Sequence, residues 1–294
     1  MKALILEELI WPELKQVLPE IELAVVPVGA CEQHGPNTTF NTDTARAYGF
    51  SKMIGERFGS QVLVCPPVPY GISVHHMAFP GTVTLRCETY INLLTDIAMA
   101  LSKHGIRRIV FLNGHGGNSG SLSAVINILK YEHGIDAYYS GIGLNLFEEG
   151  ITPEMGWSEN LGHASESETA QAMVLCPEVV RAERKKGEVV EGFIIRGKEA
   201  PFRYGGCAWN WKEDASANGA LGDARLANVD DGARLNQIAL FSNGITGHPG
   251  PDTFIFYIDP QTVGNRYLLA TVTITQRHLR NSPINRPRRL VGNL

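Results

Sequence analysis

Long apolar runs are missing from this sequence of 294 residues. No stretch approaches the roughly 18 apolar residues that a membrane-spanning helix requires, so we expect no membrane partner. Residues 1–16, MKALILEELIWPELKQ, carry acidic residues inside an apolar pattern and lack a small-residue cleavage site, which argues against a signal peptide. The five cysteines show no C-x-x-C spacing, which argues against a disulfide framework and a cysteine-based zinc site. We therefore expect a protein of the reducing cytoplasm.

A strong charge of either sign is also missing. The formal net charge is −4 at pH 7, so the composition gives no sign of a nucleic-acid partner. The arginine-rich segment 285–294, NRPRRLVGNL, is a local exception that we interpret as a solvated tail or a subunit contact. The sequence contains no G-x-S-x-G nucleophile elbow, so acyl-enzyme chemistry has no candidate residue. A small-molecule partner remains as the expectation.

Apolar segments alternate with amphipathic helical patterns along the first half of the chain. This alternation predicts a mostly parallel sheet covered by helices on both faces, a three-layer α/β/α sandwich. The expected strands are 23–30, 61–71, 106–114 and 135–141, and the expected helices are 42–59, 87–105 and 119–134. In such sheets, ligands bind beyond the carboxyl ends of the strands.

The second half of the chain is less regular. We expect helices at 165–175 and 224–245, a possible strand at 188–197, and a glycine-rich aromatic loop at 202–223. Trp157, Trp209 and Trp211 fall in loops of this half, where tryptophans typically form a lid or a subunit interface. With no repeat and no low-complexity linker, residues 1–294 are expected to form one domain, with 246–294 as a C-terminal extension.

The segment 29–47, GACEQHGPNTTFNTDTARA, holds the first candidate site. Glu32 and His34 are two positions apart just beyond an expected buried strand, so on extended chain they point to the same side. Asp43 follows at the start of a helix. One alternative is that Asp43 only favours a helix N-terminus and that Glu32 caps a turn. For the three together we favour a metal site, whose oxygen and imidazole donors suit zinc, manganese or iron(II).

A second candidate lies at 113–120, NGHGGNSG, where His115 follows another expected strand. The competing interpretation is a phosphate-binding loop of an NAD-dependent oxidoreductase, with Asp136 about 20 residues further on to meet a ribose. The dinucleotide fingerprint requires glycine at its last position, and here that residue is Ser119. We therefore rank the oxidoreductase second.

A third candidate is 162–171, GHASESETAQ. His163 could be an acid/base or support a metal ligand, and Glu168 could be a further ligand. Glu166 is equally ambiguous. The local pattern by itself favours a helix capping box between Ser165 and Glu168, which requires no chemistry. His75 and His76 lie in a loop rich in proline and glycine, where they could either line a pocket or be solvated.

Five motifs together resemble those of the creatininase (creatinine amidohydrolase) family, in the same order and spacing over roughly residues 20–245. They are VPVGACEQHGPN with NTD, PYGISVHHMAFPGTVTL, NGHGGN, HASESET and GALGDARLANVDDGARL. The resemblance implies a creatininase-like three-layer α/β/α fold and a homohexamer. It also implies two divalent metal ions per chain, zinc with manganese or iron(II) as possibilities. The implied ligands are Glu32, His34, Asp43, His115 and Glu168, with Asp43 bridging the ions.

By the same resemblance His163 is the catalytic histidine. We keep Glu166, which is near it in the sequence, as a reserve acid/base. The implied reaction is hydrolysis of a cyclic amide or related C–N bond by a metal-activated water, with the three tryptophans closing over a small ring. Other family members deformylate a formamide, trim a peptide or open the ring of a keto-cyclitol of the dehydro-inosose type. Creatininases carry a glutamate where this chain has Gly117, so we expect little or no turnover of creatinine.

Overall fold

A computed structural model describes residues 1–142, 155–158, 162–190, 208–242, 253–257 and 269–273. Its central feature is a five-stranded sheet in which every neighbouring pair of strands is parallel. The strand order is β1-β3-β2-β4-β5, and the strands are β1 (Leu4–Ile5), β2 (Leu23–Val28), β3 (Val62–Val64), β4 (Arg108–Asn113) and β5 (Asp136–Gly141). The expected parallel sheet is confirmed. It gains β1, an edge strand that the periodicity did not indicate.

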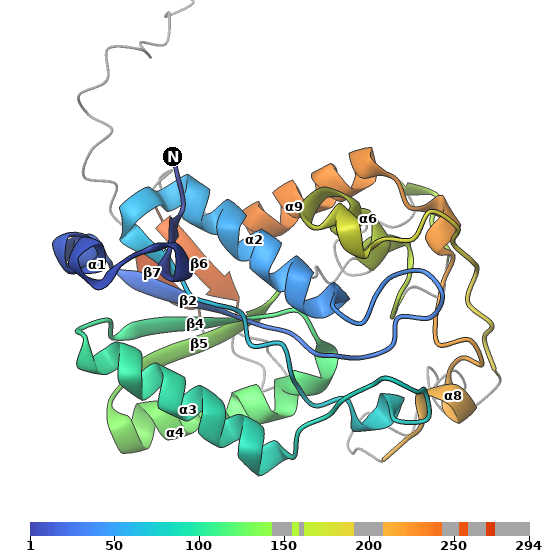
Figure 1. Cartoon of the computed structure of the whole chain (residues 1–294), viewed down its shortest axis with the longest axis horizontal. Coiled ribbons are helices and arrows are strands. Elements are labelled where there is room, and N and C mark those ends of the chain that lie inside the picture. Colours follow the sequence, from blue (N-terminus) through green and yellow to red (C-terminus); the bar gives the residue numbers. More distant parts are fainter. Residues whose placement is uncertain (143–154, 159–161, 191–207, 243–252, 258–268, 274–294) are drawn as a thin grey trace, which may run out of the picture.

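Helices cover both faces of the sheet, as Figure 1 shows. On one face lie α2 (Thr42–Phe58), α6 (Glu166–Leu175) and α9 (Val229–Ser242). On the other face lie α3 (Cys87–Lys103) and α4 (Ser119–His133), and the short helix α1 (Trp11–Val17) lies to one side. The result is the expected three-layer α/β/α sandwich, with helix bounds within a few residues of those predicted for the first half of the chain.

The two faces of β2 form two separate cores. All six residues of β2 are buried. Val26 and Val28 pack in one cluster with Tyr90 of α3, whereas Val25 packs in a second cluster with Phe50 of α2. This division follows from the two-residue period of a strand, because successive side chains point to opposite faces. A sheet buried on both faces holds the ends of its strands firmly, and the candidate residues follow these ends.

Some expectations for the second half are changed or lie outside the described residues. The helix expected at 224–245 begins as a short turn, Ala224–Leu226, before α9 starts at Val229. Of the strand expected at 188–197, residues up to 190 are described, and they form only an isolated bridge between Val189 and Ser216. In the proposed extension 246–294, β6 (Thr253–Tyr257) and β7 (Leu269–Thr273) pair antiparallel, and the rest lies outside the described residues.

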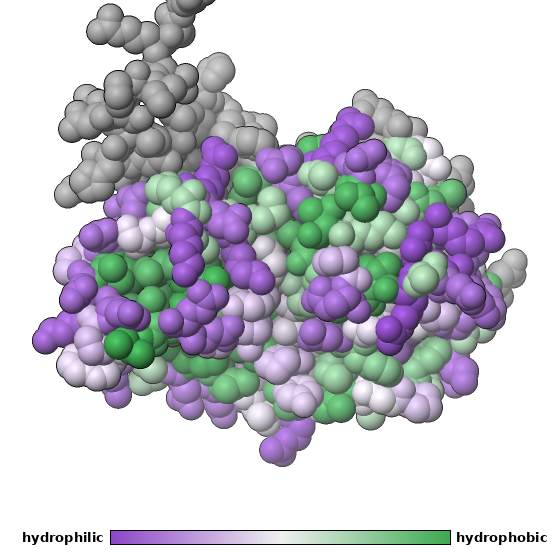
Figure 2. Space-filling view, turned by 45° about the horizontal axis from the view of Figure 1, so that its top comes forward, coloured by the Kyte–Doolittle hydropathy of each residue, from purple (hydrophilic) through white to green (hydrophobic). Residues whose placement is uncertain are grey.

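Apolar and hydrophilic side chains are intermixed on the surface of the molecule on the side that carries α2 (Figure 2). In Figure 2, apolar side chains form separate patches that are interrupted by hydrophilic side chains. Among the described residues, no helix combines the length and apolarity needed to cross a membrane.

Candidate metal centre

A cavity of about 530 Å³ lies beyond the carboxyl ends of β2 and β4. Its wall contains carboxylates, imidazoles and indoles, from Glu32, Asp43, Glu168, His75, His76, His115, His163, Trp209 and Trp211. His34 lies directly behind this wall, with its Nε2 atom 3.1 Å from Asp43 Oδ1. The structure thus gathers all five residues that the sequence analysis proposed as metal ligands.

Two glycines allow the start of α2 to approach the strand ends closely. A Cβ atom at Gly114, after β4, would lie 2.3 Å from the carbonyl oxygen of Asp43. A Cβ atom at Gly29, after β2, would lie 2.3 Å from the hydroxyl of Thr44. Any side chain at either position would push the helix away. Glycine at both positions therefore lets Asp43 reach the gap between the ends of β2 and β4.

The carboxylate of Asp43 faces two different groups of side chains. Its Oδ1 atom lies 3.1 Å from Nε2 of His34, which is 3.7 Å from Oε2 of Glu168. Its Oδ2 atom lies 3.4 Å from Nδ1 of His115, which is 3.1 Å from Oε1 of Glu32. Each oxygen of this carboxylate therefore lies near one imidazole, and each of these imidazoles lies near one further carboxylate.

Several buried oxygens in this cluster have no hydrogen-bond donor. Both carboxylate oxygens of Glu32 and Oδ2 of Asp43 are buried without a hydrogen-bond partner. Burying an unpaired carboxylate costs several kcal/mol as an order of magnitude, so such groups are normally paired with cations or bind metals. The unpaired oxygens, together with the nearby imidazoles, fit the donor set of a transition-metal site.

The pKa values of these side chains also indicate that positive charge is favoured within the cluster. Burial opposes the charged form of His34, but the neighbouring Asp43 outweighs it and raises the pKa of His34 to about 9. Burial likewise opposes ionisation of Asp43, but His34 and His115 hold the pKa of its carboxyl well below the usual range. The pKa of His115 is raised because Glu32 and Asp43 outweigh its burial. Protons on the imidazoles thus balance the carboxylates where no metal does.

Backbone carbonyls fix the rings of His34 and His115. Nδ1 of His34 lies 3.2 Å from the carbonyl oxygen of Glu32, and Nε2 of His115 lies 2.9 Å from that of Ile72. A carbonyl accepts only, so these ring nitrogens donate, and the opposite nitrogens face Asp43. Metal-binding histidines are commonly oriented in this way by a hydrogen bond from the second ring nitrogen.

Glu168 does not form the capping box that the local pattern favoured. The side chain of Ser165 makes no capping hydrogen bond at the start of α6. Oε2 of Glu168 instead accepts from the backbone amide of Ala164 at 2.7 Å, and Oε1 accepts from Arg46 at 2.8 Å. The capping-box interpretation is therefore wrong, because an arginine from α2 draws this carboxylate toward the centre.

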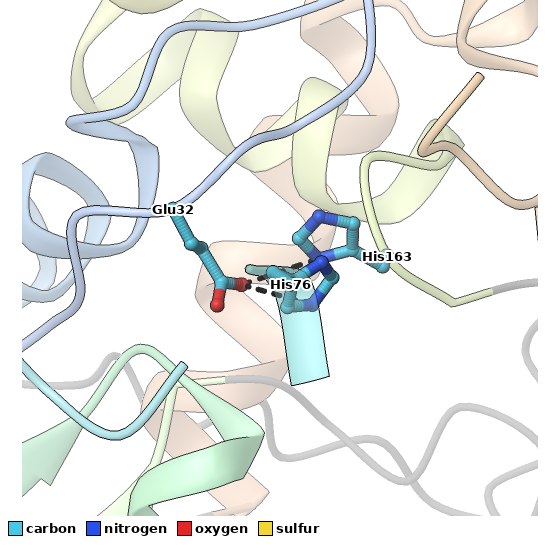
Figure 3. Close-up of side chains that lie close together, drawn as sticks. All are labelled: Glu32, His76 and His163. Carbon is cyan, nitrogen blue, oxygen red and sulfur yellow. Dashed lines mark ion pairs between the residues drawn. The ribbon is translucent and has the colours of Figure 1, made fainter. Parts of the chain in front are cut away.

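The two residues proposed as acid/bases lie in different surroundings. His163 lies in the cavity wall, with Nδ1 3.5 Å from Oε1 of Glu32 (Figure 3). Glu166 is fully buried and is absent from the cavity wall. Its Oε1 atom accepts from the amide and the hydroxyl of Ser158, at 3.0 and 2.5 Å. The structure thus brings His163, but not Glu166, to the cluster.

The histidine pair of the 69–85 motif, His75 and His76, lies at the site. The sequence had left open whether these residues line a pocket or are solvated. His76 is 1% exposed, and its Nε2 atom lies 3.6 Å from Oε1 of Glu32. His75 lies against the rings of His115 and Trp209, with centroid distances of 5.7 and 4.9 Å. Burial among neighbouring imidazoles lowers the pKa of His75 to about 4. A histidine pair in a loop gave no signal strong enough to find this placement.

The three tryptophans do not act together. Trp209 and Trp211 line the cavity with their ring centroids 5.1 Å apart. Trp157 instead packs in an apolar cluster with Ala170 of α6 and Leu235 of α9. The lid interpretation is thus wrong for Trp157, whose indole is held between two helices.

Two further residues were missed by the sequence analysis. The guanidinium of Arg46 is buried beside Glu168, and the amide of Gln33 lies between His76 and His163. Arg46 lies one helical turn after Asp43, which is the one signal that could have pointed to it. Gln33 stands between two proposed ligands in the chain, but the histidines that its amide contacts belong to distant segments.

Comparisons with known proteins agree with this geometry. A family model described as "Creatininase: Creatinine amidohydrolase" matches residues 7–241. The mycofactocin precursor peptide peptidase of Mycolicibacterium smegmatis is 32% identical over 232 residues, which cover 75% of this chain and 82% of that protein. The 3-dehydro-scyllo-inosose hydrolase of Thermotoga maritima is 27% identical over 198 residues, 63% of this chain and 60% of that protein. A solved structure described as creatininase Mn aligns with a TM-score of 0.65 and 25% identity, covering 81% of this chain and 95% of that one.

Proposed function

This chain belongs to the creatininase family of hydrolases, and from that premise we propose that it uses two divalent metal ions to hydrolyse a cyclic amide or a related C–N bond of a small molecule. The observation that carries the proposal is the position of Asp43. Its two oxygens face two different imidazoles, of His34 and His115, at 3.1 and 3.4 Å. A carboxylate between two donor groups is the arrangement that a bridging ligand requires.

The proposed ligands form two sets that share Asp43. One set is Glu32, Asp43 and His115, and the other is His34, Asp43 and Glu168. Mixed oxygen and imidazole donors suit zinc, manganese or iron(II) better than calcium or magnesium. A manganese form among the similar solved structures supports the same range of metals. When bound, the ions would polarise the substrate carbonyl and lower the pKa of a water molecule toward neutrality.

We assign the proton transfer of the reaction to His163. Its Nε2 atom donates to the carbonyl oxygen of Gln33 at 2.5 Å, which leaves Nδ1 directed toward Glu32. Burial, together with the nearby His34, lowers the pKa of His163, so its Nδ1 is free to accept a proton and pass it to a leaving nitrogen. Glu166 is the weaker candidate, because its carboxylate faces Ser158.

Two features of the cavity limit the range of substrates that we expect. The indoles of Trp209 and Trp211 in the cavity wall provide flat apolar surfaces suited to a small ring or a planar amide. The position where creatininases carry a glutamate is Gly117, whose Cβ would lie 2.2 Å from the carbonyl oxygen of Ile72. A side chain there would have to displace this carbonyl, and the glycine supplies no carboxylate, which supports poor turnover of creatinine.

A second reaction of the same site is ring opening of a keto-cyclitol, or removal of a formyl group. The 27% sequence identity with a hydrolase of 3-dehydro-scyllo-inosose favours the keto-cyclitol over the formyl compound. The same metal-activated water and the same histidine would serve either reaction.

We further propose that the chain acts in the cytoplasm as a homohexamer. Light scattering of the purified protein tests the oligomeric state.

Metal analysis and a substrate screen test the proposal. We expect about two equivalents of transition metal per chain, and loss of hydrolysis after treatment with a chelator. The screen contains lactams, formamides, keto-cyclitols and dipeptide amides, with creatinine as the compound expected to fail. Protein without bound metal after growth in zinc and manganese, or full turnover in the presence of chelator, would contradict it. NADH binding in a fluorescence titration would favour the oxidoreductase alternative instead.

A further inference from the structure

Three histidines of the metal centre share one hydrogen-bond pattern. His34, His115 and His163 each direct one ring nitrogen at a backbone carbonyl oxygen, at 3.2, 2.9 and 2.5 Å. A carbonyl oxygen accepts only, so this nitrogen carries the proton in the neutral ring. The lone pair is then on the nitrogen that faces the carboxylates. All three rings are therefore oriented to bind a metal ion or to accept a proton.

His76 has the opposite pattern, because its partner outside the cavity is a donor. Its Nδ1 atom lies 2.8 Å from Nε2 of Gln33. The orientation of the Gln33 amide follows from two backbone groups. Oε1 accepts from the amide of Gly35 at 2.8 Å, and Nε2 donates to the carbonyl of Gly219 at 3.1 Å. With the amide reversed, both contacts would be lost, so Gln33 presents N–H to His76 and the ring must accept at Nδ1.

A neutral imidazole that accepts at Nδ1 carries its proton on Nε2. We propose that Gln33 holds His76 in this form, so that His76 donates a hydrogen bond to the substrate oxygen beside Glu32 and does not bind a metal ion. Figure 3 shows how His76 and His163 both turn toward the carboxylate of Glu32. The three form a ligand-like group by distance alone, and the hydrogen bonds separate their roles. This assignment of His76 rests on the proposed hydrolase function.

Packing holds the donor in place. The ring of Trp211 stacks on His76 with centroids 4.6 Å apart and an angle of 28°. The Gln33 amide is held from the other side by Gly219, where φ is +87° and a Cβ would lie 1.9 Å from Oε1 of Gln33. Only glycine suits that position, because it allows both the positive φ and the close approach.

A fixed donor is catalytically useful where charge develops on the reacting oxygen. Donors of this kind contribute about 10²–10³-fold to kcat when they are placed before the reaction begins. His76 is then a catalytic residue, whereas Gln33 is a positioning residue that acts through it.

A neutron crystal structure of the zinc-loaded protein reads the proton directly. We expect a deuteron on Nε2 of His76 and none on Nδ1. In Gln33→Glu the acceptor for Gly35 is kept and the donor is lost, so the deuteron should move to Nδ1 or occupy both nitrogens. A wild-type ring with its proton on Nδ1, or an Nε2 atom that coordinates zinc, would overturn the proposal.

Metal content and kinetics supply the second readout. His76→Leu and His76→Gln should both keep the metal content of the parent, because His76 is not a ligand. With the lactam that the parent hydrolyses fastest, His76→Leu should lower kcat about 10²-fold or more with KM little changed. His76→Gln, which retains an N–H donor, should recover part of that loss. Loss of metal in His76→Leu, or equal kcat in all three proteins, refutes the assignment. A parent that binds metal but hydrolyses none of the screened compounds would instead refute the proposed function, while the neutron result still decides the tautomer.

Discussion

The guanidinium of Arg46 lies 2.8 Å from the carboxylate of Glu168 and reaches it from the neighbouring helix. The side chain of Arg46 is 4% exposed, and a second guanidinium nitrogen donates to Gln171 at 2.7 Å. Burial raises the pKa of Glu168, but Arg46 together with His34 and His163 outweighs burial and lowers it. Arg46 therefore helps to keep Glu168 ionised, and the other carboxylate oxygen, which accepts from the amide of Ala164, lies 3.7 Å from Nε2 of His34.

Replacement of this arginine should destabilise the fold. In Arg46→Met the carboxylate of Glu168 loses its buried partner, which costs about 3–5 kcal/mol of the free energy of unfolding. Urea denaturation of the metal-free protein measures the change. Lys130→Met is the control, because Lys130 pairs with Asp136 at the surface, where both side chains are exposed. An unfolding midpoint lowered equally in both variants would show that burial of the Arg46 pair adds nothing.

Asp43 is expected to be required for both metal ions. Asp43→Ala removes the carboxylate shared by the two ligand sets, so metal content should fall from about two equivalents to near zero, and turnover should be lost. Plasma emission spectrometry of the purified variant gives the metal content. Asp136→Ala removes an exposed carboxylate paired with Lys130 and should change neither quantity. Hydrolysis by Asp43→Ala at the parent rate would rule out the bridging role.

Two adjacent glycines offer a matched pair of substitutions. A Cβ at Gly117 would lie 2.2 Å from the carbonyl oxygen of Ile72 and 2.4 Å from Nε2 of His115. Gly117→Ala should therefore displace His115, weaken metal binding and cost about 1–3 kcal/mol of stability. A Cβ at Gly116 meets nothing within 4 Å, so Gly116→Ala should leave metal binding almost unchanged. Thermal unfolding and zinc titration compare the two, and equal effects would contradict the packing argument.

Metal binding should strengthen as the pH rises. In the metal-free protein the pKa of His34 is raised from 6.5 to about 9, so its ring is charged at neutral pH and must lose a proton before Nε2 can bind a metal ion. Zinc affinity is then expected to increase between pH 6 and 9, with release of protons. Calorimetric titrations in buffers of different ionisation enthalpy count these protons. An affinity independent of pH over this range would show that His34 is not a ligand.

The stability of the metal-free protein should change with pH in the opposite sense. The folded pKa of His34 is above its unfolded value, so its stabilising contribution is complete below about 6.5 and is lost as the pH rises through about 9. The metal-free protein should therefore unfold at lower urea concentration at pH 9 than at pH 7. His34→Gln should reduce this difference, and an unchanged difference would assign it to other groups.

The sequence by itself determined the layered fold and the residues at the strand ends. Apolar runs such as 23–28 must be buried on both faces, and alternation with helical patterns leaves a parallel sheet as the arrangement that buries them. Because parallel strands end at one edge, Glu32, His34 and His115 could be placed together from their positions in the chain alone. Asp43 was found in the same way, since it begins the helix that follows β2.

Only the tertiary structure decided which groups orient these side chains. Gln33 meets His76 from 43 positions away, and Arg46 meets Glu168 from 122 positions away. Local patterns predicted a capping box for Glu168 and left His76 open, because a pattern of neighbouring residues carries no information about distant partners. Hydrogen-bond direction, tautomer and burial exist only once those segments pack against one another. That is why the metal ligands could be proposed from sequence, whereas the division of the histidines into acceptors and one donor required the fold.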